Sequence, residues 1–278
     1  MKNIFYILFL VILASSCSEY QKVLKKGDLK PKFDMANKMY SEGIAEEKNS
    51  KLVKAIKLYE QIEPTLQGKP QAQIVQFNLA NAYYHAGDYL ISAYKFERFT
   101  KAYPNSQKLE ESFFKSAESF YHESPRYTLD QTDTERAIAK LQVYINEYPD
   151  GEYFDKANAY LKELQYKIQQ KYYEIAKQYH YTLRYKAAIS DFDNYLVNYP
   201  GSPFKEKAYY YKFESAYLLA INSFQYLVEE RLEEANAFYD DYIERYPEGE
   251  FIELANDYKT DIDERLIEIS KNTITIQQ

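Results

Sequence analysis

The chain is patterned as a series of amphipathic helices that end at Tyr-Pro pairs. Twelve, eight and five positions before each proline stand a small, a large and an aromatic residue. Offsets of four and seven place these residues on one face of a helix, and proline ends that helix. The four pairs are Tyr103-Pro104, Tyr148-Pro149, Tyr199-Pro200 and Tyr246-Pro247, and a shortened copy comprises Ala55, Tyr59, Ile62 and Pro64.

A second pattern, aromatic-x-x-Ala-x-x-x-aromatic, precedes each of these helices. It reads Phe33, Ala36, Tyr40; Phe77, Ala80, Tyr84; Phe114, Ala117, Tyr121; Tyr173, Ala176, His180; and, more weakly, Phe213, Ala216. A small residue inside an aromatic-rich helix lets a neighbouring helix approach closely. The two patterns predict five antiparallel helix pairs over residues 31–249 and an amphipathic helix over 251–270. They also predict one unbroken helix over 153–179 and long loops over 124–132 and 222–228.

Paired helices with small residues at their crossings resemble the tetratricopeptide repeat, a unit of nominally 34 residues. The predicted fold class is therefore all-α: a tetratricopeptide-repeat solenoid of about five helix pairs plus a C-terminal capping helix. A cap is expected because the last repeat of a solenoid otherwise exposes its stacking face.

The N-terminus is predicted to direct export. After Lys2, a run of ten apolar residues is half as long as a membrane-spanning helix. Ala14-Ser15-Ser16 then precedes Cys17, the only cysteine, and resembles a bacterial lipobox with Ala14 where Leu is commoner. The resemblance implies cleavage after residue 16 and a covalent lipid on Cys17, with no other cofactor; the alternative is a secretory signal that leaves Cys17 as a plain thiol. The predicted divisions are signal peptide 1–16, lipidated Cys and linker 17–30, solenoid 31–270 and tail 271–278.

Composition narrows the functional classes. A single cysteine excludes an internal disulfide framework, and a net charge of −7 argues against nucleic-acid binding. Aromatic residues make up 17% of the chain, with 32 Tyr and 16 Phe but no Trp. Charge is unevenly spread: residues 229–268 hold fifteen Asp and Glu against four Lys and Arg, whereas residues 22–32 hold five Lys and one Asp. The basic stretch is either a solvated linker or a contact with anionic lipid.

No enzymatic motif is visible, and the chain is predicted not to be an enzyme. It lacks a phosphate-binding glycine loop, an HExxH motif and a nucleophile elbow. His85, His122 and His180 each follow a tyrosine near the end of a first helix. Equivalent positions in adjacent repeats lie roughly 10 Å apart, so these histidines are expected at helix C-termini rather than around a metal. Acidic pairs such as Asp240-Asp241 are expected on a solvated face.

Three segments carry a more specific resemblance. Residues 17–25, 124–131 and 137–149 resemble the BamD family of outer-membrane β-barrel assembly lipoproteins, in the version found in Bacteroidetes-type bacteria. The resemblance implies a lipid-anchored, periplasm-facing scaffold at the outer membrane that docks on the POTRA domains of a BamA-like barrel and binds unfolded outer-membrane proteins. The alternative is a tetratricopeptide lipoprotein that binds peptides or glycans for nutrient uptake. The absence of Trp, the usual sugar-stacking residue, disfavours it.

Two sets of binding residues follow as hypotheses. The first helices of a tetratricopeptide solenoid line its concave face, where aromatic side chains with amides between them suit an alternating apolar and aromatic strand. This substrate-binding set is Phe33, Asn37, Tyr40, Phe77, Asn81, Tyr84, Phe114 and Tyr121, and its alternative role is stacking core. The partner-docking set is the acidic Glu233, Glu234, Asp240 and Asp241, which alternatively keep the cap soluble.

Overall fold

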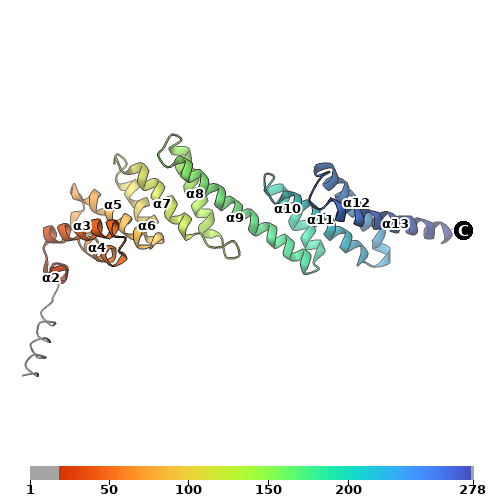
Figure 1. Cartoon of the computed structure of the whole chain (residues 1–278), viewed down its shortest axis with the longest axis horizontal. Coiled ribbons are helices and arrows are strands. Elements are labelled where there is room, and N and C mark those ends of the chain that lie inside the picture. The colour runs from red at the N-terminus through yellow and green to blue at the C-terminus, as the bar shows by residue number, and fades with distance from the viewer. Residues whose placement is uncertain (1–18, 277–278) are drawn as a thin grey trace, which may run out of the picture. The chain divides into compact units, whose positions relative to one another are not determined.

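The computed structural model describes residues 19–276, with side chains to residue 271. Every regular element in this part of the chain is a helix, so the fold is all-α (Figure 1). The α-helices are α2 (Glu19–Lys26), α3 (Leu29–Ala45), α4 (Asn49–Ile62), α5 (Gln71–Ala86), α6 (Tyr89–Ala102), α7 (Leu109–Glu123), α8 (Thr132–Glu147), α9 (Phe154–Tyr181), α10 (Tyr185–Asn198), α11 (Lys205–Ile221), α12 (Gln225–Arg245) and α13 (Ile252–Ile276). A 3₁₀ turn, η1 (Glu63–Leu66), follows α4.

The described residues form two compact units. The first unit holds residues 19–125 and 130–164, and the second holds residues 126–129 and 165–276. The prediction of one unbroken helix over 153–179 is confirmed, because α9 runs without a break for 28 residues. Residues 154–164 of α9 belong to the first unit and the remainder of α9 to the second.

In the first unit each helix from α3 to α8 packs on the next along the chain. The predicted small residues stand at the crossings and are 0% exposed: Ala36, Ala55, Ala80, Ser92, Ala117 and Ala137. The one serine among them has its hydroxyl paired across the crossing, since Ser92 Oγ of α6 donates to the Ala80 carbonyl of α5 at 3.1 Å. Ala157, Leu161 and Leu164 of α9 close the same core against α7 and α8. The first part of α9 therefore acts as a cap on three helix pairs.

The second unit repeats this arrangement with two pairs and a cap. The later part of α9 packs with α10 around Tyr173, Ala176 and Phe192. α11 packs on α12, and α13 lies against both. The small residues Ala188, Ala216, Ala235 and Ala255 are again at most 1% exposed. The predicted solenoid of five pairs (α3/α4, α5/α6, α7/α8, α9/α10, α11/α12) with α13 as its cap is thus confirmed.

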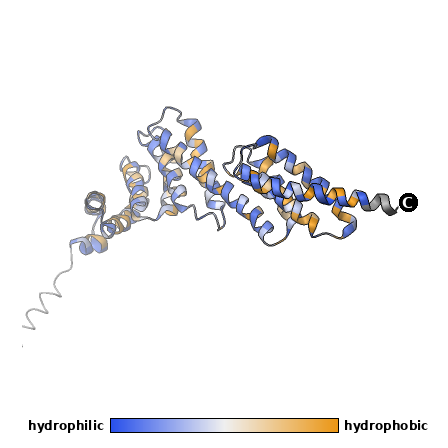
Figure 2. Cartoon of the chain, turned by 45° about the vertical axis from the view of Figure 1, so that its right-hand side comes forward, coloured by the Kyte–Doolittle hydropathy of each residue, from blue (hydrophilic) through white to orange (hydrophobic). Residues whose placement is uncertain are grey.

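The aromatic residues build the core between helices. Figure 2 shows hydrophobic residues alternating with hydrophilic ones along each helix, as expected of helices that bury one face. Tyr59, Tyr144, Tyr173 and Tyr242 are among the largest fully buried side chains. Each meets an aromatic residue of the other helix of its pair edge-on or tilted, as Tyr144 meets Phe114 with centroids 5.5 Å apart. The high tyrosine content is largely explained by this use as core.

Two of the four Tyr-Pro turns are closed by a serine. Ser106 Oγ accepts the Lys108 amide at 3.0 Å, and Ser202 Oγ accepts the Phe204 amide at 3.1 Å. Such side-chain bonds to backbone amides two residues on are a usual function of serine in turns. Both serine turns lie within a unit and lead into another helix pair, since α7 and α11 follow them.

The other two turns carry glycine and are closed by a glutamate from the first helix. Glu110 Oε1 accepts the Tyr144 hydroxyl at 2.9 Å and the Glu152 amide at 2.7 Å beside Gly151. At Gly249, Glu206 accepts the Tyr242 hydroxyl and the Glu250 amide in the same way. A Cβ at Gly151 would lie 2.5 Å from the Glu110 carboxylate oxygen, so the glycine makes room for it. These glycine turns precede α9 and α13, the two capping helices.

One predicted loop is wrong. The connection expected over 222–228 shortens to three residues, 222–224, because α12 begins at Gln225. Residues 225–228 contain neither glycine nor proline, and nothing there interrupts a helix. α12 has 21 residues, whereas α6, its counterpart in the second pair, has 14. The residues expected to form a loop are therefore an additional N-terminal segment of α12. The loop expected over 124–132 is present between α7 and α8.

Candidate functional site

The predicted substrate-binding set divides by burial. Phe114 is 1% exposed and stacks on Tyr153 with centroids 4.5 Å apart. Phe77 is 9% exposed and lies edge-on to Phe96 and Phe99 of α6. These phenylalanines are core residues that a ligand cannot reach without disturbing the packing. Phe33 is half-buried against the first core.

The amides of the set are engaged with neighbouring tyrosines. Asn81 Nδ2 donates to the Tyr40 hydroxyl at 2.6 Å, and Asn37 Oδ1 accepts the Tyr59 hydroxyl at 2.7 Å. Asn37 and Asn81 each directly follow the crossing alanine of their helix. Asn81 therefore connects α5 to α3, and Asn37 connects α3 to α4. Tyr40, to which Asn81 donates, is half-exposed.

Glu118 occupies on α7 the position that Asn37 occupies on α3 and Asn81 on α5, and sequence reasoning missed it. It directly follows Ala117, as Asn81 follows Ala80, so the repeat alignment could have identified it. Its side chain is 1% exposed and lies 3.1 Å from Lys115 Nζ and 2.6 Å from Lys156 Nζ. The Tyr160 hydroxyl donates to the same carboxylate at 3.2 Å. A buried carboxylate thus joins α7 to α9 inside the first unit.

Opposing effects act on the Glu118 carboxyl. Burial by itself raises its pKa, but the hydrogen bonds and positive charges of Lys156 and Lys115 outweigh burial and hold the pKa below the ordinary value. Glu118 is therefore ionised at neutral pH. A buried charge without a partner is costly, so the two lysines stabilise the ionised carboxylate.

Tyr84 and Tyr121 surround this charged cluster. Lys115 Nζ lies 3.8 Å from the centroid of the Tyr84 ring, whose hydroxyl is 3.3 Å from His122 Nε2. Tyr121 stacks on Tyr160 with centroids 3.8 Å apart and donates to Glu163. Tyr84 and Tyr121 are half-exposed and His122 is exposed. We name Tyr40, Tyr84, Tyr121 and His122 the aromatic row of the first unit; it presents rings and hydroxyls on α3, α5 and α7.

The second unit has a corresponding cluster with the charges exchanged. Lys177, which follows Ala176, lies 5.3–5.7 Å from the ring centroids of Tyr173, Tyr181 and Tyr211. Glu214 accepts the Tyr258 hydroxyl at 2.9 Å and lies 3.3 Å from His180 Nε2. Both clusters thus combine lysine, a carboxylate and tyrosines.

The three histidines stand in the last turns of α5, α7 and α9, as predicted. Desolvation by the side chains around them lowers the pKa of all three, although only His180 is buried. They are therefore neutral at pH 7 and gain little from the helix dipole. His180 is instead held by Ser215 Oγ, 2.9 Å from its Nδ1. Among residues 19–271, no group of three or more His, Cys, Asp or Glu side chains is arranged to hold a metal.

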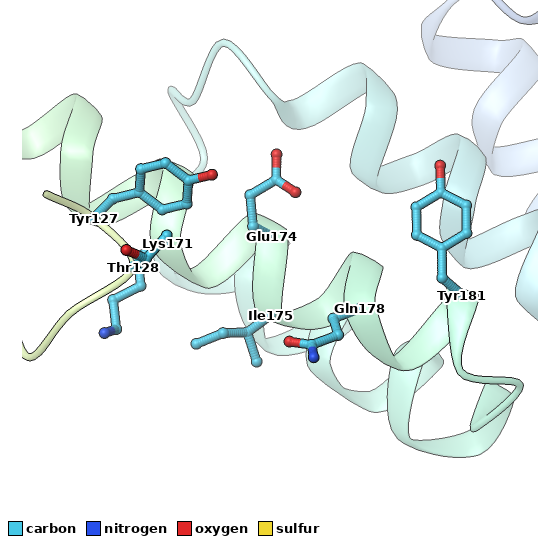
Figure 3. A pocket seen from close by; sticks show the side chains of 7 residues that line it. All are labelled: Tyr127, Thr128, Lys171, Glu174, Ile175, Gln178 and Tyr181. Carbon is cyan, nitrogen blue, oxygen red and sulfur yellow. The ribbon is translucent and has the colours of Figure 1, made fainter.

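The loop between α7 and α8 forms a cavity with α9 in the second unit. The cavity has a volume of about 400 Å³ and is lined by Tyr127, Thr128, Lys171, Glu174, Ile175, Gln178 and Tyr181. Figure 3 shows Tyr127 directed along the helix towards Glu174, with Tyr181 further on. Lys171 Nζ donates to the Leu129 carbonyl and ties the loop to α9. The loop belongs to a segment that the sequence had marked as family-specific.

The predicted docking residues lie on α12. Glu233 and Asp240 are seven residues apart, as are Glu234 and Asp241, so all four share one side of the helix. Leu232, Ala235 and Tyr242 on the other side are buried. Three of the acids are exposed, and Asp241 is partly neutralised by Arg245 at 2.8 Å. We call these four residues the acidic face.

An exposed aromatic pair precedes the acidic face. Phe224 and Tyr226 are 73% and 80% exposed, and their rings stack with centroids 6.0 Å apart. Sequence reasoning missed them because it assigned this segment to a loop. Large apolar side chains exposed together are typical of contact surfaces.

Cys17 lies outside the described residues, two positions before the first of them. Within the described part of the chain, no helix has the length and apolar character required to cross a bilayer. α9, α12 and α13 are long enough, but they are amphipathic rather than uniformly apolar.

Comparison with known proteins identifies the family. The YfiO family, described as outer membrane lipoproteins, matches residues 33–226, well over half of the chain. This chain belongs to the YfiO family. A protein of Aquifex aeolicus (strain VF5) named as the outer membrane protein assembly factor BamD is 28% identical over 229 residues, which cover 81% of this chain and 72% of the relative. The YfiO match includes the aromatic row and ends before the acidic face.

Proposed function

We propose that this chain is a lipid-anchored scaffold subunit of an outer-membrane β-barrel protein assembly complex. It docks on the POTRA domains of a BamA-like barrel subunit and binds unfolded outer-membrane proteins on the periplasmic side. The observation that carries this proposal is the YfiO match over residues 33–226, which spans four of the five helix pairs and part of the fifth. The name of the Aquifex relative supports the assembly role.

The anchor in this proposal is Cys17. It follows a short apolar run and three small residues, and one residue, Ser18, separates it from α2. Several acyl chains, each contributing about 0.8 kcal/mol per buried CH₂, hold a protein on a membrane durably where a single short chain does not. Anchoring there leaves the whole repeat region in the aqueous phase.

The docking surface in this proposal combines the acidic face with the aromatic pair. Like charges on one side of a helix attract and orient a basic partner, mainly by raising the association rate. Most of the affinity is expected from the aromatic residues, since interface energy concentrates in a few buried aromatic side chains. Phe224 and Tyr226 are exposed in the described structure and are available for this contact.

Association kinetics with isolated POTRA domains test the docking surface. Converting Glu233, Glu234, Asp240 and Asp241 to Lys is expected to slow association at least about tenfold at low salt and to flatten its salt dependence. The matched control converts four exposed acids of the first unit that have no ion pair among the described residues: Glu135, Glu147, Asp150 and Asp155. Equal on-rates for the two variants contradict the assignment.

The aromatic row is the proposed site for unfolded barrel strands. Its half-exposed rings and hydroxyls lie on three successive first helices, and a strand with alternating aromatic residues can contact them in turn. Phe77 and Phe114 are left out of this site because they are core. They support the row from behind.

Fluorescence anisotropy with a C-terminal peptide of a barrel protein tests the row. Tyr84→Ser with Tyr121→Ser is expected to weaken binding about tenfold or more, since truncated aromatic contacts commonly cost upwards of 1 kcal/mol each. Tyr94→Ser is the control, because Tyr94 is 51% exposed but lies on the second helix α6. Unchanged affinity in the double variant, with an unchanged unfolding transition, rules the row out.

A further inference from the structure

α2 presents three lysines away from the body of the first unit. Tyr20 is buried, and Val23 and Leu24 pack against the first core. Lys22, Lys25 and Lys26 are exposed on the opposite side of this eight-residue helix. They have no carboxylate partner among the described residues, whereas Lys30 is paired with Asp34 at 2.8 Å.

α2 is held on α4 by a specific contact. The Tyr20 hydroxyl donates to the Lys54 carbonyl at 3.3 Å, and Lys54 Nζ lies 5.4 Å from the centroid of the Tyr20 ring. These contacts fix the direction of α2 relative to α4. The N-terminal helix is therefore part of the folded unit and not a free linker.

A groove about 450 Å³ in volume runs between the two helices. Its lining includes Tyr20, Leu24, Ser50, Val53, Lys54 and Lys57. Lys54 and Lys57 are exposed and, within the described structure, form no ion pair. By contrast, Lys51 of the same helix is neutralised by Glu42 and Glu46 at 2.7 and 2.5 Å. The free cations of α4 thus gather on the side where α2 lies.

The distance to the anchor decides what this surface meets. Only Ser18 separates Cys17 from α2, and two extended residues span about 7 Å at most. A lipid on Cys17 therefore brings α2 to within about a Debye length, ~8 Å, of the bilayer surface. Lysines at that range attract anionic headgroups.

We propose that the groove between α2 and α4, lined by Lys54 and Lys57, and the neighbouring exposed side of α2, which carries Lys25, bind the phosphate headgroups of anionic phospholipids in the membrane that holds the anchor. This inference rests on acylation of Cys17, and it adds a second attachment that sets how the first unit stands on the membrane. A protein attached to a membrane only through one acylated residue is free to rotate about that residue. A cationic groove that binds headgroups beside the acylated residue restricts this rotation.

Vesicle sedimentation tests the headgroup contact without the lipid. The chain from Ser18 onwards, which keeps every described residue, is mixed with phosphatidylcholine vesicles that do or do not contain phosphatidylglycerol. Binding is expected only with phosphatidylglycerol and is lost at high salt. Since each lysine near an anionic surface strengthens binding about fivefold, replacing Lys25, Lys54 and Lys57 with Gln is expected to weaken it about 100-fold.

A charge-matched variant separates a defined surface from general attraction. Lys162, Lys186 and Lys205 form no ion pair within the described residues and lie far along the chain from α2; replacing them with Gln changes the net charge equally. Equal loss in both triple variants, or no binding to anionic vesicles at low salt, overturns the inference.

Amine labelling of the acylated full chain in the same vesicles distinguishes this failure from failure of the anchor. Lys54 and Lys57 are expected to react several times more slowly on anionic than on neutral vesicles, and Lys186 equally on both. Equal labelling of Lys54 on both vesicles contradicts the groove assignment. The mass of the N-terminal peptide independently reports whether Cys17 carries lipid.

Discussion

Replacing Gly151 with alanine is expected to destabilise the first unit, although the position has an ordinary backbone conformation. A Cβ there would lie 2.5 Å from Glu110 Oε1, 2.7 Å from the Tyr144 hydroxyl and 2.9 Å from Tyr148 Cβ. The first two atoms end side chains and can move, but moving them breaks the hydrogen bonds that close the turn before α9.

The magnitude follows from the bonds at risk. Tyr144 and the Glu152 amide donate to Glu110, and the Tyr153 amide donates to the Tyr144 hydroxyl at 3.1 Å. Three hydrogen bonds at about 1 kcal/mol each, partly replaced by water at this half-exposed turn, give an expected loss of about 2–3 kcal/mol in the free energy of unfolding.

Urea unfolding of the variant and two controls measures this loss. Gly201→Ala lies in another Tyr-Pro turn where nothing approaches within 4 Å, and it is expected to change stability by less than about 0.5 kcal/mol. With Glu110→Ala already present, Gly151→Ala is expected to cost much less, because the two changes remove the same bonds. A loss at Gly151 no larger than at Gly201, or full additivity with Glu110→Ala, refutes the turn mechanism.

Two further predictions concern the charged cluster and the anchor. Glu118→Gln is expected to lower the free energy of unfolding by about 2 kcal/mol at pH 7, since hydrogen bonds to a charged group are lost. The pKa of Glu118 is lower in the folded than in the unfolded chain. The stability that its charge contributes is therefore complete above the unfolded pKa near 4.3 and disappears as pH falls through the folded pKa. Urea midpoints of the wild type and variant should therefore converge below about pH 4, and a constant difference across that range contradicts the charge-based explanation. Cys17→Ser is expected to shift the chain from the membrane to the soluble fraction or to leave it uncleaved, as seen by fractionation and immunoblotting; normal processing and membrane attachment of that variant exclude acylation at this position.

The sequence predicted the helices and their crossings because both depend on local spacing. Ala80 and Ser92 were identified as crossing residues from the repeat alone, and both are fully buried. The sequence also contains serine after two of the Tyr-Pro pairs and glycine after the other two. The structural role of this difference could not be predicted from the sequence, because Glu110 is 41 positions from Gly151 and only the packed structure brings them together.

The direction of aromatic side chains was harder to predict. Phe77 and Tyr84 are seven residues apart on the same helix, so periodicity places them on one face. Phe77 is nevertheless covered by Phe96 and Phe99 of α6, whereas Tyr84 lies near the end of α5 beside the exposed His122. Where a neighbouring helix ends decides between core and surface, and this is a long-range property.

Recovery of the native membrane complex tests the proposed function most directly. The acylated chain, tagged at its C-terminus, is purified from its own membranes, and the partners are identified and quantified by mass spectrometry. We expect a β-barrel protein with POTRA domains in near-stoichiometric amount. Its recovery is expected to fall when Glu233, Glu234, Asp240 and Asp241 are converted to Lys and to stay unchanged in the charge-matched control of the first unit. Recovery of a small-molecule transporter in place of that barrel contradicts the proposed function.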